Sequence, residues 1–190
     1  MNASATSQHN GQAADTGAEP ALIPHWIGGA AEAPAGRSRD VTESATGATI
    51  ARVPLGSAQD ADRAVAHASG AAGAWGAATL AFRTQVLFRF RGLVDAYRDD
   101  LAQLITREHG KVLDDARGEV ARGLEVVDFA CGLPHLLKGE MSGSVSGGVD
   151  SYSLRQPLGV VAGITPFNFP VMVPLWMFPV ALAAGNAFIL

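Results

Sequence analysis

Apolar positions recur at helical spacing through the middle of this chain. Ser57 and Asp60 form a near capping box that opens a predicted helix with its apolar face reaching Trp75. A second, longer helix is predicted from Thr79 to a stop at Gly110. A third predicted helix follows and ends near residue 132. Its apolar face consists of Leu113, Ala116, Val120, Leu124, Val127 and Cys131.

Shorter segments with strand character lie on either side of these helices. Apolar residues at 22–27 end in a Gly-Gly pair and predict a strand and turn. Residues 41–54 surround a Thr-Gly pair and predict a hairpin. Residues 144–155 alternate in polarity around a second Gly-Gly pair and predict another hairpin. A two-stranded ribbon is marginally stable alone, so we expect this second hairpin to pair with something else, with an oligomer contact as the candidate.

The last part of the chain contains no charged residue after Arg155. Residues 158–164 predict a parallel strand buried on both faces, because they are rich in Val, Ile and Ala between glycine and proline. A loop over 165–170, an apolar helix and the start of a second strand follow. Helices, a hairpin and a strand–helix–strand unit together indicate an α/β domain with a parallel sheet.

The uncharged stretch has an alternative interpretation as a transmembrane helix. Prolines at 166, 170, 174 and 179 interrupt it, and Asn168 and Asn186 would lie in or near the bilayer. Basic flanking residues are also absent on its C-terminal side. We therefore favour the buried strand over a membrane-anchored protein.

Composition narrows the function classes. A chain of 190 residues that is 48% hydrophobic suits one domain with a core, while a net charge of −4 argues against nucleic-acid binding. Residues 1–21 carry almost no large apolar side chain and predict a disordered tail.

The histidines lack metal-ligand spacing, so no metal site is expected. Cys131 is expected to be a small core residue, and the lack of a signal peptide favours the cytoplasm.

The loop after the predicted parallel strand is the candidate site, because ligands bind at the C-terminal ends of strands in open α/β sheets. Asn168 lies in this loop between Pro166 and Pro170, which restrict the backbone around it. A rigidly held carboxamide N–H suits the charge that develops on a carbonyl oxygen. An ordinary turn asparagine is equally compatible with the residue types. Neither a G-x-G-x-x-G nor a P-loop motif is present.

At these residues the sequence resembles the aldehyde dehydrogenase superfamily, and most of all its CoA-acylating methylmalonate-semialdehyde dehydrogenases. Phenylalanine before the loop asparagine is typical of that subgroup, whereas the superfamily usually has tryptophan. The motifs that carry the resemblance are His25-Trp26-Ile27-Gly28-Gly29, Glu108-His109-Gly110-Lys111, Gly118-Glu119-Val120, Arg122-Gly123-Leu124-Glu125, Pro166-Phe167-Asn168-Phe169-Pro170, Pro174-Leu175-Trp176-Met177-Phe178-Pro179 and Gly185-Asn186.

The resemblance implies oxidation of a small semialdehyde with NAD as cofactor and coenzyme A as acyl acceptor, giving propionyl-CoA or acetyl-CoA. It implies that Asn168 is the oxyanion-hole donor, that Thr165 and Phe167 line the nicotinamide cofactor, and that Arg122 binds the substrate carboxylate. Without the resemblance, Arg122 would be interpreted as a solvated helix arginine paired with Glu119 or Glu125. The 144–155 hairpin matches the family's oligomerisation ribbon, which implies a homo-oligomer.

The resemblance covers residues 22–190 and the N-terminal part of the family's NAD-binding domain. The family's catalytic cysteine and second half of the dinucleotide-binding fold have no counterpart in this sequence. We therefore expect that the chain alone oxidises no aldehyde. A fragment of another acid-semialdehyde dehydrogenase and a non-catalytic fragment that pairs with full-length subunits remain the alternatives.

Overall fold

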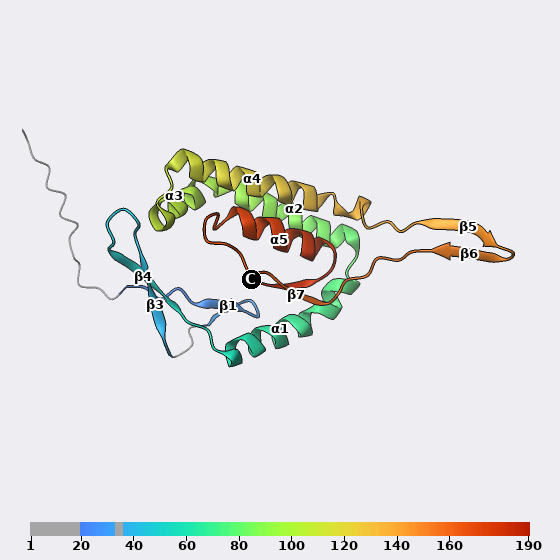
Figure 1. The fold of residues 1–190 in the computed structure, drawn as a ribbon, viewed down its shortest axis with the longest axis horizontal. Coiled ribbons are helices and arrows are strands. Elements are labelled where there is room, and N and C mark those ends of the chain that lie inside the picture. Colours follow the sequence, from blue (N-terminus) through green and yellow to red (C-terminus); the bar gives the residue numbers. More distant parts are fainter. Residues whose placement is uncertain (1–19, 33–35) are drawn as a thin grey trace, which may run out of the picture.

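A computed structural model describes residues 20–32 and 36–190, so the tail predicted for residues 1–21 lies almost wholly outside the described residues. The helices are α1 (Ala58–Ala77), α2 (Leu80–Ala96), α3 (Arg98–His109), α4 (Leu113–Cys131), the short 3₁₀ helix η1 (Leu133–His135) and α5 (Met172–Ala183). The strands are β1 (His25–Ile27), β2 (Ala30–Glu32), β3 (Ser38–Thr42), β4 (Thr49–Pro54), β5 (Met141–Ser146), β6 (Val149–Tyr152), β7 (Val160–Ala162) and β8 (Ala187–Ile189). Helices α2, α3 and α4 lie along one long side of the molecule and α1 along the other, with α5 and β7 between them (Figure 1).

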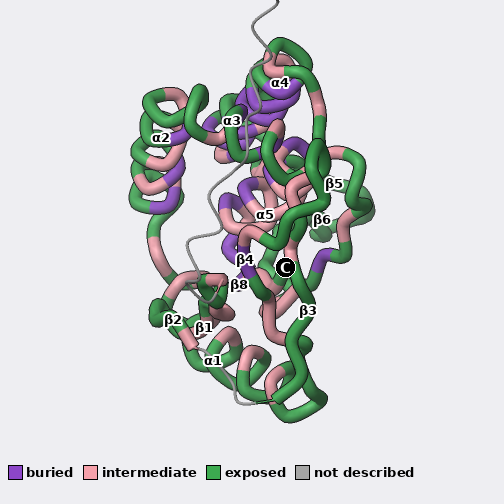
Figure 2. The backbone as a smooth tube through the Cα atoms, turned by 90° about the vertical axis from the view of Figure 1, so that its left-hand side faces the viewer, coloured by how far each residue is buried: buried purple, intermediate pink, exposed green. Residues whose placement is uncertain are grey.

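The hydrophobic core lies where α4 packs against α2, α3 and α5. Buried residues gather along α4 and α5 (Figure 2). Gly123 permits the close approach of these two helices, because a Cβ at this position would lie 2.6 Å from Leu175 Cδ1 and 3.3 Å from Met172 Cα. The buried residues of this core are Val94, Ala102, Ile105, Ala116, Val120, Leu124, Val127 and Leu175.

The single helix predicted over 79–109 is in fact two helices. Tyr97 separates α2 from α3 with φ −102° and ψ 15°. The prediction was wrong because no glycine or proline marks the break and the apolar spacing continues through it. Asp99 and Asp100 are the local signal of a new start, since carboxylates are favoured in the first turn of a helix. The break allows Ile105 of α3 to join the core against α4.

The capping box predicted at the start of α1 is confirmed. The Ser57 N–H donates to Asp60 Oδ2 at 2.6 Å, and the Asp60 N–H donates to Ser57 Oγ at 3.3 Å. Hydrogen bonds from the Ser57 backbone and hydroxyl, with a further one from Arg63, lower the pKa of Asp60 to about 2. These bonds satisfy donors that a helix N-terminus otherwise leaves without partners.

A buried arginine joins the C-terminal ends of α1 and α5. Arg83 Nε donates to the Ala183 carbonyl at 3.2 Å, and Nη1 donates to the carbonyls of Gly76 and Ala78 at 3.0 and 2.8 Å. Burial lowers the pKa of its guanidinium. The side chain supplies donors to carbonyl oxygens at or just beyond helix ends, where intrahelical partners are lacking.

The two N-terminal turns predicted from the sequence are confirmed as antiparallel hairpins. Strands β1 and β2 pair around Gly28 and Gly29, whose φ angles of 61° and 81° suit the tight turn. Strands β3 and β4 pair with a register shift between Val41 and Thr42.

Strands β7 and β8 are parallel, with Val160 opposite Ala187, which confirms the start of a parallel sheet. The strand predicted over 158–164 is nevertheless shorter than expected and is not buried on both faces. Leu158 and Ile164 are 88% and 96% exposed. Burial of both faces needs covering layers on each side, and in the described part of the chain β7 has β8 as its single strand neighbour.

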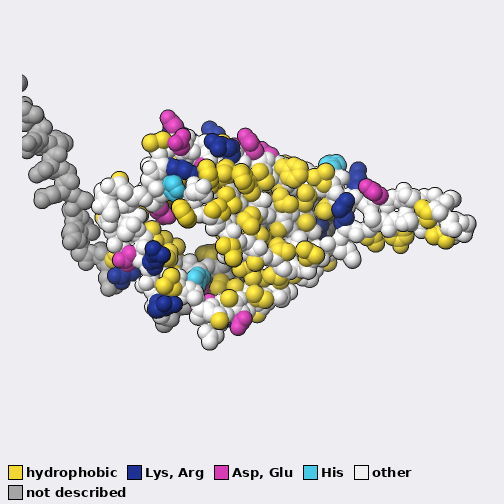
Figure 3. Space-filling model, viewed as in Figure 1, with side chains coloured by type: hydrophobic (Ala, Val, Ile, Leu, Met, Phe, Trp, Pro, Cys, Tyr) yellow, Lys and Arg dark blue, Asp and Glu magenta, His cyan; other side chains and the backbone are white. Residues whose placement is uncertain are grey.

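The hairpin predicted over 144–155 is confirmed, with strands that begin slightly earlier. Strands β5 and β6 pair antiparallel, and every residue in them is exposed. The hairpin projects beyond the helices at one end of the molecule (Figure 1), and apolar side chains lie along it (Figure 3). They include Met141, Val145, Val149 and Tyr152.

The helices of the described residues do not support the alternative of a membrane span. Within residues 20–32 and 36–190, no helix combines the length and apolar character that crossing a bilayer requires. The helix of the uncharged stretch, α5, has 12 residues and contains Pro179.

Candidate active site

The loop predicted as the site leaves the C-terminal end of β7 and leads into α5. Thr165 is half-buried, whereas Phe167 is 88% exposed and Asn168 is exposed. The structure therefore brings these three predicted residues together at the edge where ligands bind in open α/β sheets. No hydrogen bond among the described residues involves the Asn168 side chain, so its carboxamide is available to a ligand.

The start of β7 is held by Asn186, which directly precedes β8. Asn186 is buried, and its Oδ1 accepts from the N–H groups of Leu158 at 2.7 Å and Gly159 at 3.2 Å. Its Nδ2 donates to the Ala181 carbonyl in α5 at 3.2 Å. One side chain thus connects β7, α5 and the entry to β8, and fixes the strand from which the loop departs.

The backbone of the loop is held by Lys111, which lies in the turn between α3 and α4. Lys111 Nζ donates to the Asn168 carbonyl at 2.8 Å and to Glu119 Oε2 at 2.5 Å. The same ammonium lies 3.8 Å from the centre of the Phe169 ring, which is a cation–π contact. Lys111 therefore contacts two consecutive residues of the loop, one through the backbone and one through the side chain.

Glu119 of α4 connects this lysine to the first turn of α5. Its carboxylate is fully buried, and Oε1 accepts from the N–H groups of Val171 at 2.8 Å and Met172 at 3.2 Å. Burial by itself raises the pKa of Glu119, but the bonds from Lys111 and from the two N–H groups outweigh it. The pKa of this carboxyl consequently lies below its ordinary value.

Sequence reasoning did not assign a site role to Lys111 or Glu119. A signal for Glu119 was present, because it lies on the apolar face of α4 between Ala116 and Val120. A carboxylate on a buried helix face requires a cation and further donors. The sequence does not show that these come from Lys111 and from the N-terminus of α5.

Arg122 lies on α4 one turn after Glu119, so both residues project from the same side of the helix. It is exposed, and its Nη2 would lie 3.7 Å from a Cβ at Gly118. None of the ion pairs in the described part of the chain includes Arg122, so the predicted alternative of pairing with Glu119 or Glu125 does not occur. The guanidinium is therefore free to meet an anionic group.

Cys131 lies at the end of α4 within a second buried cluster that includes Leu87 and Ala183. Burial first, and then the nearby carboxylate of Asp128, raise the pKa of its thiol. A buried thiol with a raised pKa is a poor nucleophile. The prediction that Cys131 is a small core residue is confirmed.

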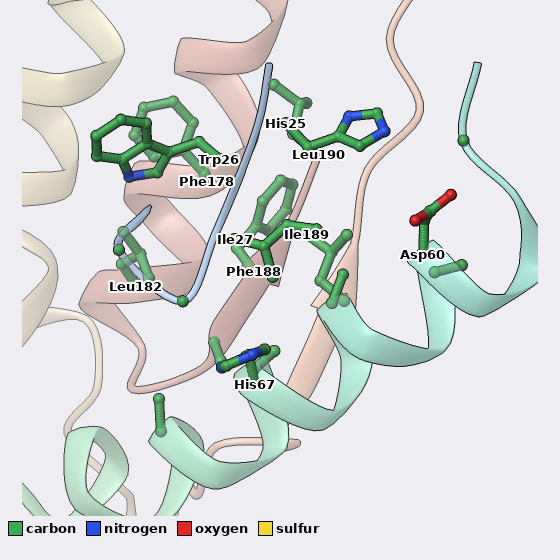
Figure 4. Close-up of a pocket in the computed structure, with 18 of the residues that line it drawn as sticks. His25, Trp26, Ile27, Asp60, His67, Phe178, Leu182, Phe188, Ile189 and Leu190 are labelled. Atoms are coloured by element: carbon green, nitrogen blue, oxygen red, sulfur yellow. The ribbon is translucent and has the colours of Figure 1, made fainter. Parts of the chain in front are cut away.

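An apolar hollow of about 1000 Å³ lies between β1, α1, α5 and β8 (Figure 4). Trp26, His67 and Phe188 are among the residues that line it. Neither the 165–168 loop nor Arg122 is among the lining residues. The hollow and the candidate active site are therefore separate features. Among the described residues, no group of three or more His, Cys, Asp or Glu could hold a metal ion.

Comparison with known proteins agrees with this arrangement of strand, loop and helix. The model of the aldehyde dehydrogenase family matches residues 31–190, and the chain belongs to this family.

Among the most similar relatives, the malonate-semialdehyde dehydrogenase of Pseudomonas aeruginosa is 49% identical over 87% of this chain and 33% of its own length. The acylating methylmalonate-semialdehyde dehydrogenase of Arabidopsis thaliana is 46% identical over 90% of this chain and 28% of its own length. A Sinorhizobium meliloti protein assigned as a methylmalonate-semialdehyde dehydrogenase and solved with NAD superposes with a TM-score of 0.86 at 43% identity, covering 89% of this chain and 35% of that one. The chain thus spans about one third of the length of these relatives.

Proposed function

We propose that this chain supplies the N-terminal third of an NAD-dependent, CoA-acylating dehydrogenase for methylmalonate or malonate semialdehyde. The observation that carries the proposal is the exposed Asn168 carboxamide at the C-terminal end of β7, in a chain of the aldehyde dehydrogenase family. The names of the Pseudomonas and Arabidopsis relatives support this substrate class, and the Arabidopsis name supports acyl transfer.

In the proposed reaction the aldehyde carbon is oxidised and becomes the carbonyl of a thioester with coenzyme A. NAD accepts the aldehyde hydrogen as hydride, and the neighbouring carboxylate leaves as carbon dioxide. A proton, matching the one that the coenzyme A thiol loses, takes the place of the carboxylate on the α-carbon. Methylmalonate semialdehyde gives propionyl-CoA and malonate semialdehyde gives acetyl-CoA.

The described residues of the loop fit this chemistry in two ways. Asn168 donates a hydrogen bond to the carbonyl oxygen while negative charge develops on it. Thr165 and Phe167, next to it on the same loop, lie at the strand edge where a nicotinamide ring would be held, and the exposed Phe167 offers it an apolar surface. The NAD present in the Sinorhizobium structure supports this cofactor.

Arg122 is proposed to bind the carboxylate of the semialdehyde. Its guanidinium has no carboxylate partner among the described residues, and it can bind a carboxylate through two parallel hydrogen bonds.

A chimera tests the role of Asn168. Residues 20–190 of this chain replace the matching third of the Pseudomonas aeruginosa enzyme, and NADH formation is followed with coenzyme A present. We expect Asn168→Ala to lower kcat about 10²- to 10³-fold, because one oxyanion-hole donor is lost. Gln103→Ala, at an exposed position of α3, is the control and should retain kcat. An Asn168→Ala chimera with the parent kcat would refute the proposed role.

The same chimera tests Arg122 by comparing methylmalonate semialdehyde with propanal. Arg122→Met should raise KM about 10- to 100-fold for the carboxylated substrate, since a hydrogen-bonded charge is lost. The kinetics of propanal should stay unchanged. Equal loss on both substrates would contradict carboxylate binding, and would favour a positional role on α4.

The β5–β6 hairpin is proposed to pair the complete enzyme into a homo-oligomer. Its fully exposed strands and apolar side chains support this proposal. The chain alone is proposed to form no NADH from aldehyde, because Cys131 is buried with a raised pKa and no other thiol is present.

A further inference from the structure

We propose that Lys111 and Glu119 are positioning residues that together fix the orientation of Asn168. They are called the loop clamp below. This inference rests on the proposed role of Asn168 and adds the device that sets its geometry.

The first part of the loop clamp acts on the end of the loop. The first N–H groups of a helix have no partner within the helix, and Val171 and Met172 carry two such groups at the start of α5. Glu119 Oε1 accepts from both, at 2.8 and 3.2 Å. A carboxylate here also stabilises the positive end of the helix dipole. Glu119 therefore fixes the point at which the loop enters α5.

The second part acts on the residue that carries the carboxamide. Lys111 Nζ holds the Asn168 carbonyl at 2.8 Å and lies over the Phe169 ring at 3.8 Å. Rotation of the peptide unit after Asn168 would break the first contact, and displacement of the next side chain would break the second. The Asn168 side chain itself stays free of hydrogen bonds in the described structure, so the clamp orients the residue without occupying its donor.

Burial distinguishes the loop clamp from the ion pairs on the surface. The side chains of Glu119 and Lys111 are 0% and 16% exposed. Those of Arg117 and Asp99, which form an ion pair between α4 and α3, are 47% and 61% exposed. A buried ion pair must offset a large desolvation cost and is weak evidence for added stability. The contacts of this pair with the loop instead indicate that it fixes the geometry of the loop around Asn168.

A double-mutant cycle in the chimera tests the inference. Lys111→Met and Glu119→Gln should each lower kcat by about 10- to 100-fold, because small displacements of a catalytic group have effects of this size. The glutamine keeps an acceptor for the two N–H groups but loses the charge that holds Lys111. Lys111→Arg keeps the charge and should restore part of kcat. Arg117→Met, which removes the exposed ion pairs with Asp99 and Asp114, should leave kcat unchanged.

The decisive comparison is made in the Asn168→Ala background. If the loop clamp acts through Asn168, Lys111→Met should add less than about a twofold loss there, since contacting residues are not additive. A full additional loss, or no loss in the parent chimera, would overturn the inference while leaving the role of Asn168 intact. If Asn168→Ala alone retains the parent kcat, the proposed function fails instead.

A readout without catalysis uses the 190-residue chain itself. Amide hydrogen exchange at Val171 and Met172 should accelerate at least about tenfold in Lys111→Met, because Glu119 then loses its cation and the loop end opens locally. Arg117→Met should leave both rates unchanged. Unchanged exchange in Lys111→Met would also overturn the inference, whatever the kinetics of the chimera show.

Discussion

Arg83 shows how one side chain can hold two helix ends. Its guanidinium donates to carbonyl oxygens at the ends of α1 and α5, and it is buried. We expect Arg83→Met in the 190-residue chain to lower the free energy of unfolding by about 2–4 kcal/mol, because one buried and two partly buried carbonyl groups lose their donor. Urea denaturation followed by tryptophan fluorescence measures the loss.

The matched control for this prediction lies on the same helix. Arg89 is an exposed arginine of α2, and Arg89→Met should change the free energy of unfolding by less than about 0.5 kcal/mol. Equal effects of the two substitutions would mean that loss of charge, and not loss of the capping bonds, determines the result.

At the scale of single residues, the sequence predicts the structural setting of a side chain better than it predicts the residues that contact it. The two prolines around Asn168 make it a candidate site residue without separating it from a turn asparagine, whereas Cys131 is identified as a core residue because it continues an apolar helix face. Glu119 is detectable as a charge on a buried helix face, but its partners are not. Lys111 lies before the start of α4, and the N–H groups of Val171 and Met172 belong to an element more than fifty residues further along the chain. A single sequence carries no local signal for such contacts, and for this reason the loop clamp was missed.

At the scale of elements, the crossing of α4 and α5 determines where the loop sits. Gly123 lies at this crossing, and a Cβ there would meet Leu175 at 2.6 Å. We expect Gly123→Ala to lower the free energy of unfolding by about 1–3 kcal/mol, because overpacking forces the helices apart and this exceeds the gain in helix propensity. Urea denaturation measures this change.

Gly92 provides the control for Gly123. It is an exposed helical glycine, and a Cβ at this position would have no neighbouring atom within 4 Å. Gly92→Ala should therefore raise stability by about 0.5–1 kcal/mol through helix propensity alone. A stabilising Gly123→Ala would show that α5 can move at no cost, which would also weaken the argument for a fixed loop.

The order and type of the elements can be predicted from the sequence. The break between α2 and α3 and the extent of β7 cannot. The capping box at Ser57 correctly marks the start of α1. The break at Tyr97 escaped prediction because apolar spacing continues across it and no breaker residue is present. Residues 158–164 have the composition of a buried strand, but burial depends on neighbouring layers that composition does not contain.

At the scale of the whole molecule, the candidate active site lies at one edge of a two-stranded parallel sheet. Strand β7 of the parallel pair leads into the exposed loop. The hollow between β1, α1, α5 and β8 is separate from this loop. The relatives are about three times as long as this chain. The chain thus presents the proposed oxyanion donor and the candidate carboxylate-binding arginine, while its one thiol is buried with a raised pKa. One third of the family's length therefore suffices to identify the fold. The proposed chemistry also needs a reactive thiol, which Cys131 does not supply.

The β5–β6 hairpin carries the last prediction, because its exposed strands and apolar side chains favour assembly. In the chimera, Val145→Asp with Val149→Asp should convert the oligomer into smaller species, since a carboxylate in an apolar interface is costly. Sedimentation velocity measures the change in mass. The hairpin lies outside both buried clusters, so circular dichroism and the urea midpoint should stay the same. An unchanged mass would show that assembly uses a different surface. Ser142→Asp with Ser146→Asp, at polar positions along one strand of the same hairpin, tests whether charge alone disrupts assembly.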